Sequence, residues 1–196
     1  MDDIDVKSTL LQYWDHGKDI TPEEMRIVQE QNFAEKGGEA KEKMIEMSKV
    51  DEIHGGNGVF ILHGDYLSTQ NAAHYNRYKI KYVINAYSHT APRGENSITY
   101  PVTLGSVLNI QIPNNLGDMK KISPVVIGFI KMAMAMSNSV LIYCMDGSPY
   151  SLVAILLFLY DVKFNTAKAL DFLGKKIPNF TADSLIDFKW LLEAHQ

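Results

Sequence analysis

Cysteine is nearly absent from this chain of 196 residues, because Cys144 is the single one. One cysteine excludes an internal disulfide and any metal site built from several thiolates. Excess positive charge is absent too: the net charge is −4, so no overall basic field favours nucleic acid or an anionic membrane. We therefore expect no metal ion, no other cofactor, no nucleic-acid partner and no membrane partner.

Long apolar runs are absent as well. The longest strongly apolar stretch, Leu152–Leu159, is too short to cross a bilayer. The amino terminus, Met1-Asp2-Asp3-Ile4-Asp5, is acidic and does not have the pattern of a secretory or organellar signal. These features predict a cytoplasmic protein that is not secreted, and association with the cytoskeleton stays an open alternative.

The composition, 46% hydrophobic and 21% charged, is that of a globular protein with one sizeable core. Residues 1–49 differ from the rest: Thr21-Pro22-Glu23-Glu24 has the pattern of a helix start, and the apolar residues after it are sparse among charges. We predict a mostly helical extension over residues 1–49 and one domain over residues 50–196. The extension is interpreted as surface packing, with a partner-binding arm or a disordered leader as alternatives.

The domain predicted from residue 50 alternates strands with helices. Apolar runs rich in β-branched residues predict strands at residues 59–62, 81–86, 107–112 and 140–143. Helical patterns follow at residues 67–77, 123–135, 151–160, 166–175 and 182–194. This alternation predicts an α/β fold, a layered sheet with helices on its faces.

A strand end, a lone cysteine, a glycine-containing turn and a helix start follow one another between residues 143 and 151. Backbone amides of such a turn converge on one point, and the helix dipole favours negative charge there. The same field would lower the pKa of a thiol and make Cys144 a nucleophile. A small core residue at the end of a buried strand is the alternative interpretation of Cys144.

This segment reads Tyr143-Cys144-Met145-Asp146-Gly147-Ser148-Pro149-Tyr150-Ser151. It resembles the signature His-Cys-x-x-Gly-x-x-Arg-Ser/Thr of the dual-specificity protein phosphatases, in which the cysteine is the nucleophile. Segments at residues 57–62, 82–86, 108–110 and 177–179 are similar to other parts of that family, in the same order. The resemblance covers residues 50–196 and implies a mixed central sheet flanked by helices.

The departures from the signature remove favourable charge from the loop. The family's arginine, which clamps phosphate bidentately, falls at Tyr150, and the histidine before the cysteine falls at Tyr143. Asp146 adds a negative charge, and Pro149 has no N–H to donate. The resemblance therefore implies a degenerate phosphate loop consisting of Cys144, Met145, Asp146, Gly147, Ser148, Pro149, Tyr150 and Ser151.

The family's general acid aligns best with Asn115, which cannot donate a carboxylic proton. Asp118, three residues later, is the alternative acid if the loop bends. Arg93 lies in a polar loop expected near the signature and is interpreted as a solvated charge, with a cation for the site as the alternative.

These losses predict a pseudophosphatase, a catalytically inactive protein-binding or scaffold module with Cys144 as a degenerate nucleophile. Its partner would be a protein, in one version a phosphoprotein, and residues 1–49 are the candidate interaction arm. Two alternatives stay open: a weakly active atypical protein-tyrosine/serine/threonine phosphatase that uses Cys144, and a structural subunit of a larger assembly.

Overall fold

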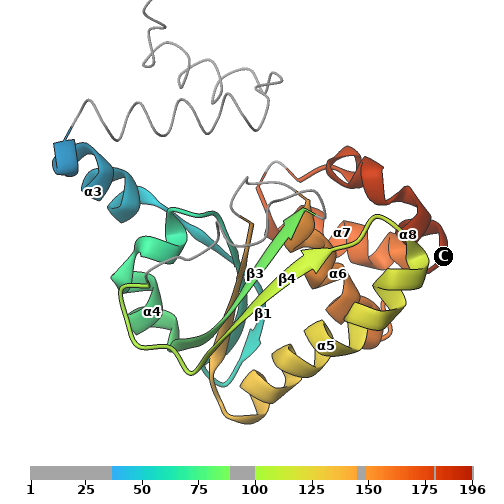
Figure 1. Cartoon of the computed structure of the whole chain (residues 1–196), viewed down its shortest axis with the longest axis horizontal. Helices are drawn as coiled ribbons and strands as arrows, with labels where there is room; N and C mark the ends of the chain where they lie inside the picture. The colour runs from blue at the N-terminus through green and yellow to red at the C-terminus, as the bar shows by residue number, and fades with distance from the viewer. Residues whose placement is uncertain (1–36, 89–99, 145–148, 179, 196) are drawn as a thin grey trace, which may run out of the picture. The chain divides into compact units, whose positions relative to one another are not determined.

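The computed structural model describes residues 37–88, 100–144, 149–178 and 180–195 (Figure 1). The chain divides into two units, Met1–Met47 and Ser48–Gln196. In the first unit, the described element is helix α3 (Gly37–Met47), on which Met44 and Met47 are 37% and 63% exposed. Residues 1–36 of the predicted extension lie outside the described residues, and residues 48–49 fall in the second unit.

A mixed five-stranded sheet with the order β1-β2-β5-β3-β4 forms the centre of the second unit. The four neighbours β2, β5, β3 and β4 are parallel, and β1 is antiparallel to β2. Their bounds are β1 (Val50–Gly56), β2 (Val59–Gly64), β3 (Ile80–Ser88), β4 (Ser106–Ile112) and β5 (Ser139–Tyr143). The predicted mixed sheet is confirmed, and the four predicted strands are the four parallel ones.

Strand β1 is the element that the apolar pattern does not predict. Of its seven residues only Ile53 is buried, because β1 forms one edge of the sheet. A two-residue turn, Asn57-Gly58, joins β1 to β2, and both of its residues have positive φ (55° and 78°). Asn-Gly is the strongest short hairpin signal in a sequence. The similarity of residues 57–62 to an opening strand therefore holds only from Val59, since the first two residues form the turn.

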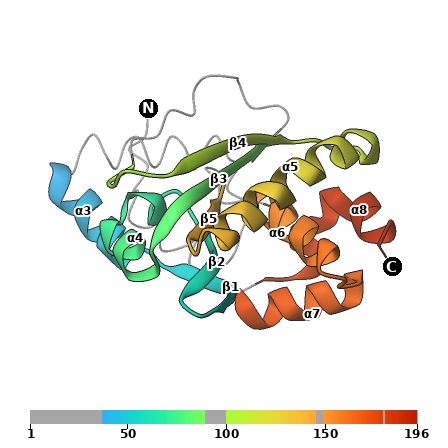
Figure 2. The same cartoon turned by 90° about the horizontal axis from the view of Figure 1, so that it is seen from below.

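Helices cover both faces of the sheet, as Figures 1 and 2 show. Helix α4 packs with one face, and the other face is covered by the helices that follow β4 and β5. The bounds are η1 (Ser68–Gln70), α4 (Ala72–Tyr78), α5 (Leu116–Ala135), α6 (Tyr150–Asp161), α7 (Thr166–Lys176), η2 (Ala182–Phe188) and α8 (Lys189–Glu193). Helix α6 is buried on all sides from Ser151 to Tyr160, which places the segment after Cys144 in the centre of the core.

Three predicted helices differ from those observed. The predicted helix over residues 67–77 is the 3₁₀ turn η1 followed by α4, with extended backbone at Asn71 between them. Helix α5 begins at Leu116 and not at Ser123, because Asn115 caps it: the Asn115 side chain accepts a hydrogen bond from the Asp118 amide, and Pro124 lies within the helix. The predicted helix over residues 182–194 is a 3₁₀ segment followed by α8, with non-helical backbone at Leu185. No helix in the described part of the chain is long and apolar enough to cross a membrane.

Candidate functional site

The carboxyl ends of the four parallel strands lie at one edge of the sheet, where ligands bind in open α/β folds. Strand β5 leads into Cys144 at this edge, and β4 leads to Asn115 and the start of α5. The fold therefore brings the predicted nucleophile and the segment of the predicted acid to the same edge.

Cys144 is 1% exposed and follows a strand whose five residues are all buried. Four residues of the predicted phosphate loop, Met145–Ser148, lie outside the described residues, and so does Arg93. On the far side of this gap, Pro149 is the N-cap of α6, and its carbonyl accepts a hydrogen bond from the Val153 amide (2.8 Å). Both flanks of the loop are thus fixed by the sheet and by α6.

Tyr150, at the position of the family's arginine, packs against the protein's own core. Its ring meets the Phe188 ring edge to face, with centroids 5.8 Å apart and an interplanar angle of 89°. It joins the larger hydrophobic cluster, on the face covered by α5 and α6. An apolar contact of this kind supplies no charge for an anion.

Tyr143, at the position of the family's histidine, is completely buried. Its hydroxyl lies 3.2 Å from the Tyr100 hydroxyl, and it packs in the second hydrophobic cluster with Tyr75. Burial, the hydrogen bond to Tyr100 and the nearby Tyr75 and Cys144 raise the pKa of Tyr143 far above its usual value. The residue before Cys144 is therefore neutral and offers no positive charge to a thiolate.

Ser151, at the last position of the signature, is 2% exposed and is hydrogen-bonded to His63, which in turn contacts Asp51. Its Oγ lies 3.1 Å from His63 Nε2, and His63 Nδ1 lies 3.4 Å from Asp51 Oδ2. His63 comes from β2, and Asp51 faces it from the neighbouring position of β1. These two residues were missed because 88 residues separate His63 from Ser151, and no short motif joins them.

Asp118 and Asn115 bind each other at the start of α5. Asn115 Nδ2 donates to Asp118 Oδ2 (3.1 Å), and Lys121 Nζ donates to Asp118 Oδ1 (2.6 Å). The bond from Lys121, followed by the bond from Asn115, lowers the pKa of Asp118. A general acid needs the opposite shift, because it must carry its proton near neutral pH. A hollow of about 400 Å³ adjoins these three residues.

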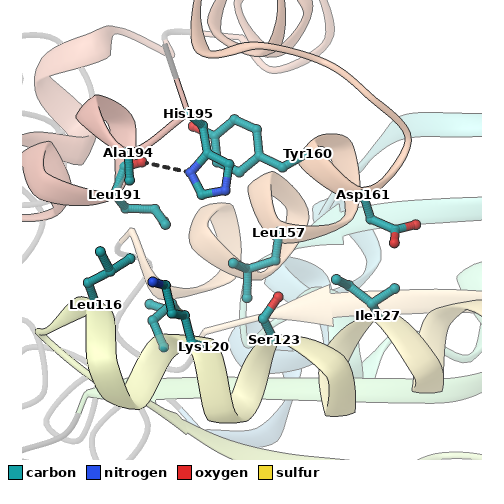
Figure 3. A pocket seen from close by; sticks show the side chains of 11 residues that line it. Leu116, Lys120, Ser123, Ile127, Leu157, Tyr160, Asp161, Leu191, Ala194 and His195 are labelled. Carbon is teal, nitrogen blue, oxygen red and sulfur yellow. Dashed lines mark hydrogen bonds between the residues drawn. The ribbon is translucent and has the colours of Figure 1, made fainter.

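A larger pocket of about 500 Å³ lies between α5, α6 and α8 (Figure 3). None of the motif residues that the structure describes lines it. At one end the His195 ring stacks on Tyr160, with centroids 4.0 Å apart, and His195 Nδ1 lies 3.1 Å from the Leu191 carbonyl oxygen. The described residues contain no group of three or more His, Cys, Asp or Glu side chains that could hold a metal ion.

Solved structures share this fold. Human DUSP28 superposes with a TM-score of 0.53 at 13% identity, over 74% of this chain and 93% of that chain. The human tyrosine phosphatase-like serine/threonine/tyrosine-interacting protein superposes with a TM-score of 0.50 at 17% identity, over 74% and 95%. A leucine rich repeat and phosphatase domain containing protein from Entamoeba histolytica superposes with a TM-score of 0.51 at 15% identity. The superposition covers 74% of this chain and 92% of that chain.

No family model matches the chain, and no curated protein sequence matches it. At 13–17% identity the structural likeness shows the fold alone. The chain thus has the mixed sheet and flanking helices of a dual-specificity phosphatase domain, and the fold that the signature implies is confirmed.

Proposed function

We propose that this protein is a pseudophosphatase, a non-catalytic module on the dual-specificity phosphatase fold that acts by binding another protein. The observation that carries the proposal is the packing of Tyr150 against Phe188 at the position where the family's arginine would clamp phosphate. Transition-state arginines in other phosphoryl-transfer enzymes contribute about 10³–10⁵ in rate, so this position alone accounts for a large loss of activity.

The other polar groups at the site support the same proposal. Tyr143 is neutral where a histidine would help to stabilise the thiolate, and Pro149 offers no amide proton. Asp118 is held in its charged form by Lys121 and Asn115, so it is a poor proton donor. A thiol without this support is a weak nucleophile at neutral pH, because only its small thiolate fraction reacts.

In this proposal the partner is a protein. If the loop still binds an anion through its backbone amides, that partner is a phosphoprotein. Residues 1–49 are the candidate interaction arm, and Met44 and Met47 on α3 are exposed apolar side chains within it. A scaffold role in the cytoplasm follows from the same proposal, because a binding module acts by holding partners together.

The first experiment is hydrolysis of a generic aryl phosphate at high protein concentration, with Cys144→Ser purified in parallel. We expect the two rates to be indistinguishable, since the cysteine lacks its cation and its acid. Turnover that depends on Cys144 would overturn the proposal and would mean that other groups complete the site.

A second measurement asks whether a cation at position 150 is the missing element. Tyr150→Arg should raise the affinity for inorganic phosphate in part, while Asp146 and Pro149 keep it weak. Tyr150→Leu is the matched control, because it loses the same contact with Phe188 without gaining a charge. Equal affinities of the two variants would mean that the loop does not present position 150 to an anion.

A further inference from the structure

The pocket between α5, α6 and α8 combines an apolar lining with a few polar groups (Figure 3). Its most buried lining residues are Met119, Leu157 and Leu191, one from each helix, and all three belong to the larger hydrophobic cluster. Pockets for small organic molecules are mostly apolar, hold about 300–1,000 Å³ and carry a few polar groups that orient the ligand. At about 500 Å³, this pocket suits a small ligand with an apolar body.

Lys120 gives the pocket a positive charge. It lines the pocket from α5, and in the described part of the chain no acidic side chain pairs with it. The next residue, Lys121, is different: it is bonded to Asp118 at 2.6 Å and lines the smaller hollow. Of these two adjacent lysines, Lys120 is therefore the one whose charge is available to a ligand.

Asp161 is the acidic residue among the described lining residues, and its charge is balanced within the protein. Its Oδ2 lies 2.7 Å from Lys131 Nζ, and the Asp161 side chain is 27% exposed. A carboxylate that already has a cation at this distance attracts a second cation weakly. The charge that the pocket offers to a ligand is thus the single positive charge of Lys120, which favours an anion.

Two neutral polar groups also face the pocket. The Ser123 hydroxyl points from α5 into it and bonds to no other side chain among the described residues (Figure 3). His195 Nδ1 donates to the Leu191 carbonyl (3.1 Å), because a carbonyl oxygen only accepts, and the second ring nitrogen lies on the pocket side. A ligand can therefore form hydrogen bonds here in addition to its charge contact.

We propose that this pocket binds a small organic carboxylate, with its apolar body against the three helices and its carboxylate at Lys120. One lysine matches a single negative charge, as in a carboxylate, better than the two charges of a phosphate monoester. A small molecule suits the space, since a stable protein partner needs about 800 Å² of surface on each side. The inference goes beyond the proposed function and does not depend on whether Cys144 reacts.

The test uses three probes that share one ring system and differ in charge: 2-naphthoate, neutral 2-naphthamide and 2-naphthylmethylammonium. Each is titrated into the full-length protein, labelled with nitrogen-15, and amide shifts are followed by NMR. We expect 2-naphthoate to shift the amides of Lys120, Ser123 and Leu191. It should bind about three- to tenfold more tightly than 2-naphthamide, because a pair with an exposed lysine adds a modest free energy, and the ammonium probe should bind most weakly.

Adjacent lysines provide the matched control. Lys120→Met should remove the preference for 2-naphthoate over 2-naphthamide and leave the affinity for the amide unchanged. Lys121→Met should keep the preference, because Lys121 lines the other hollow. Both side chains are exposed, so we expect both variants to fold. Ser123→Leu adds bulk to the pocket and should weaken both probes.

Three results would overturn the proposal: no shifts with millimolar 2-naphthoate, shifts confined to amides away from the pocket, or the same loss of preference in Lys120→Met and Lys121→Met. Tighter binding of the ammonium probe than of 2-naphthoate would overturn it as well, because Asp161 would then decide the charge of the ligand. None of these measurements involves phosphate hydrolysis, so a failure here is distinguishable from a failure of the proposed function.

Discussion

At the scale of single residues, the polar side chains around the ends of β4 and β5 bind one another. Tyr143 pairs with Tyr100, Ser151 with His63, and Asp118 with Lys121. Each of these bonds occupies a polar group of a candidate site residue with a partner inside the protein. In the proposed function, activity is therefore lost for two reasons: residue types of the signature are missing, and polar side chains that remain are bonded to partners inside the protein.

The bonds of Asp118 predict a pH-dependent contribution to stability. Its folded-state pKa lies below the ordinary value of 3.8, so the carboxylate stabilises the fold above that pH and loses its effect as the pH falls through the lowered pKa. Asp118→Asn should lower the melting temperature at pH 7 by a small amount, since the Lys121 pair is exposed. The difference from the wild type should vanish on acidification below the folded-state pKa.

Thermal unfolding followed by circular dichroism from pH 7 to pH 2 checks this prediction. Asp171→Asn is a suitable control, because Asp171 also pairs with a lysine on an exposed helix surface but lies on α7. A difference between Asp118→Asn and the wild type that grows on acidification would contradict the assignment of a lowered pKa.

Some of the site could be predicted from residue types alone. Tyr150 in place of arginine is visible in the signature, because the departure is a change of chemical type at a fixed spacing. The commitment of Ser151 to His63 could not be predicted, since it depends on the pairing of β2 with β5 and on the position of α6. Asn115 as a helix cap was visible in principle, as an asparagine three residues before an aspartate.

At the scale of elements, the strands with buried apolar residues were predicted from the sequence, and the mostly exposed strand β1 was not. The parallel strands β2, β5 and β3 lie inside the sheet and have apolar runs, so their sequences show them clearly. Strand β4 is the other edge, and its buried residues are Ile110 and Ile112. Strand β1 is an edge strand with one buried residue, Ile53, and its sequence contains no alternating pattern. The start of α5 was placed too late because Pro124, which often marks the first turn of a helix, lies within the helix here.

Thr166, the first residue of α7, joins that helix to the end of α8 by hydrogen bonds. The Thr166 hydroxyl donates to the Leu192 carbonyl (2.6 Å) and lies 3.3 Å from the Tyr160 hydroxyl, while the Thr166 amide donates to the His195 carbonyl (3.0 Å). Thr166→Val keeps the shape but leaves the Leu192 oxygen without this donor. We expect a loss of about 1–3 kcal/mol in the free energy of unfolding, measured by urea denaturation.

Thr166→Ser is the matched control for this change, because it keeps the hydroxyl and removes only a methyl group. Its cost should stay below about 1 kcal/mol. If the serine variant were as unstable as the valine variant, packing of the methyl group and not the hydrogen bond would hold α8 in place.

At the scale of the whole molecule, the described buried side chains all lie between Ile53 and Leu191. A domain over residues 50–196 stays a prediction, and the division of the chain after Met47 gives it a direct test. A chain that begins at Ser48 should unfold cooperatively in urea, with a free energy within about 1 kcal/mol of the full-length value. Non-cooperative unfolding of the shorter chain would mean that the preceding residues complete its core.

Helix α6 is surrounded by other elements over ten consecutive residues, so it cannot shift without opening the core. We therefore expect α6 to keep its position when a partner binds. We expect the protein to act by occupancy, as a competitor or a tether whose effect depends on how much of it is present.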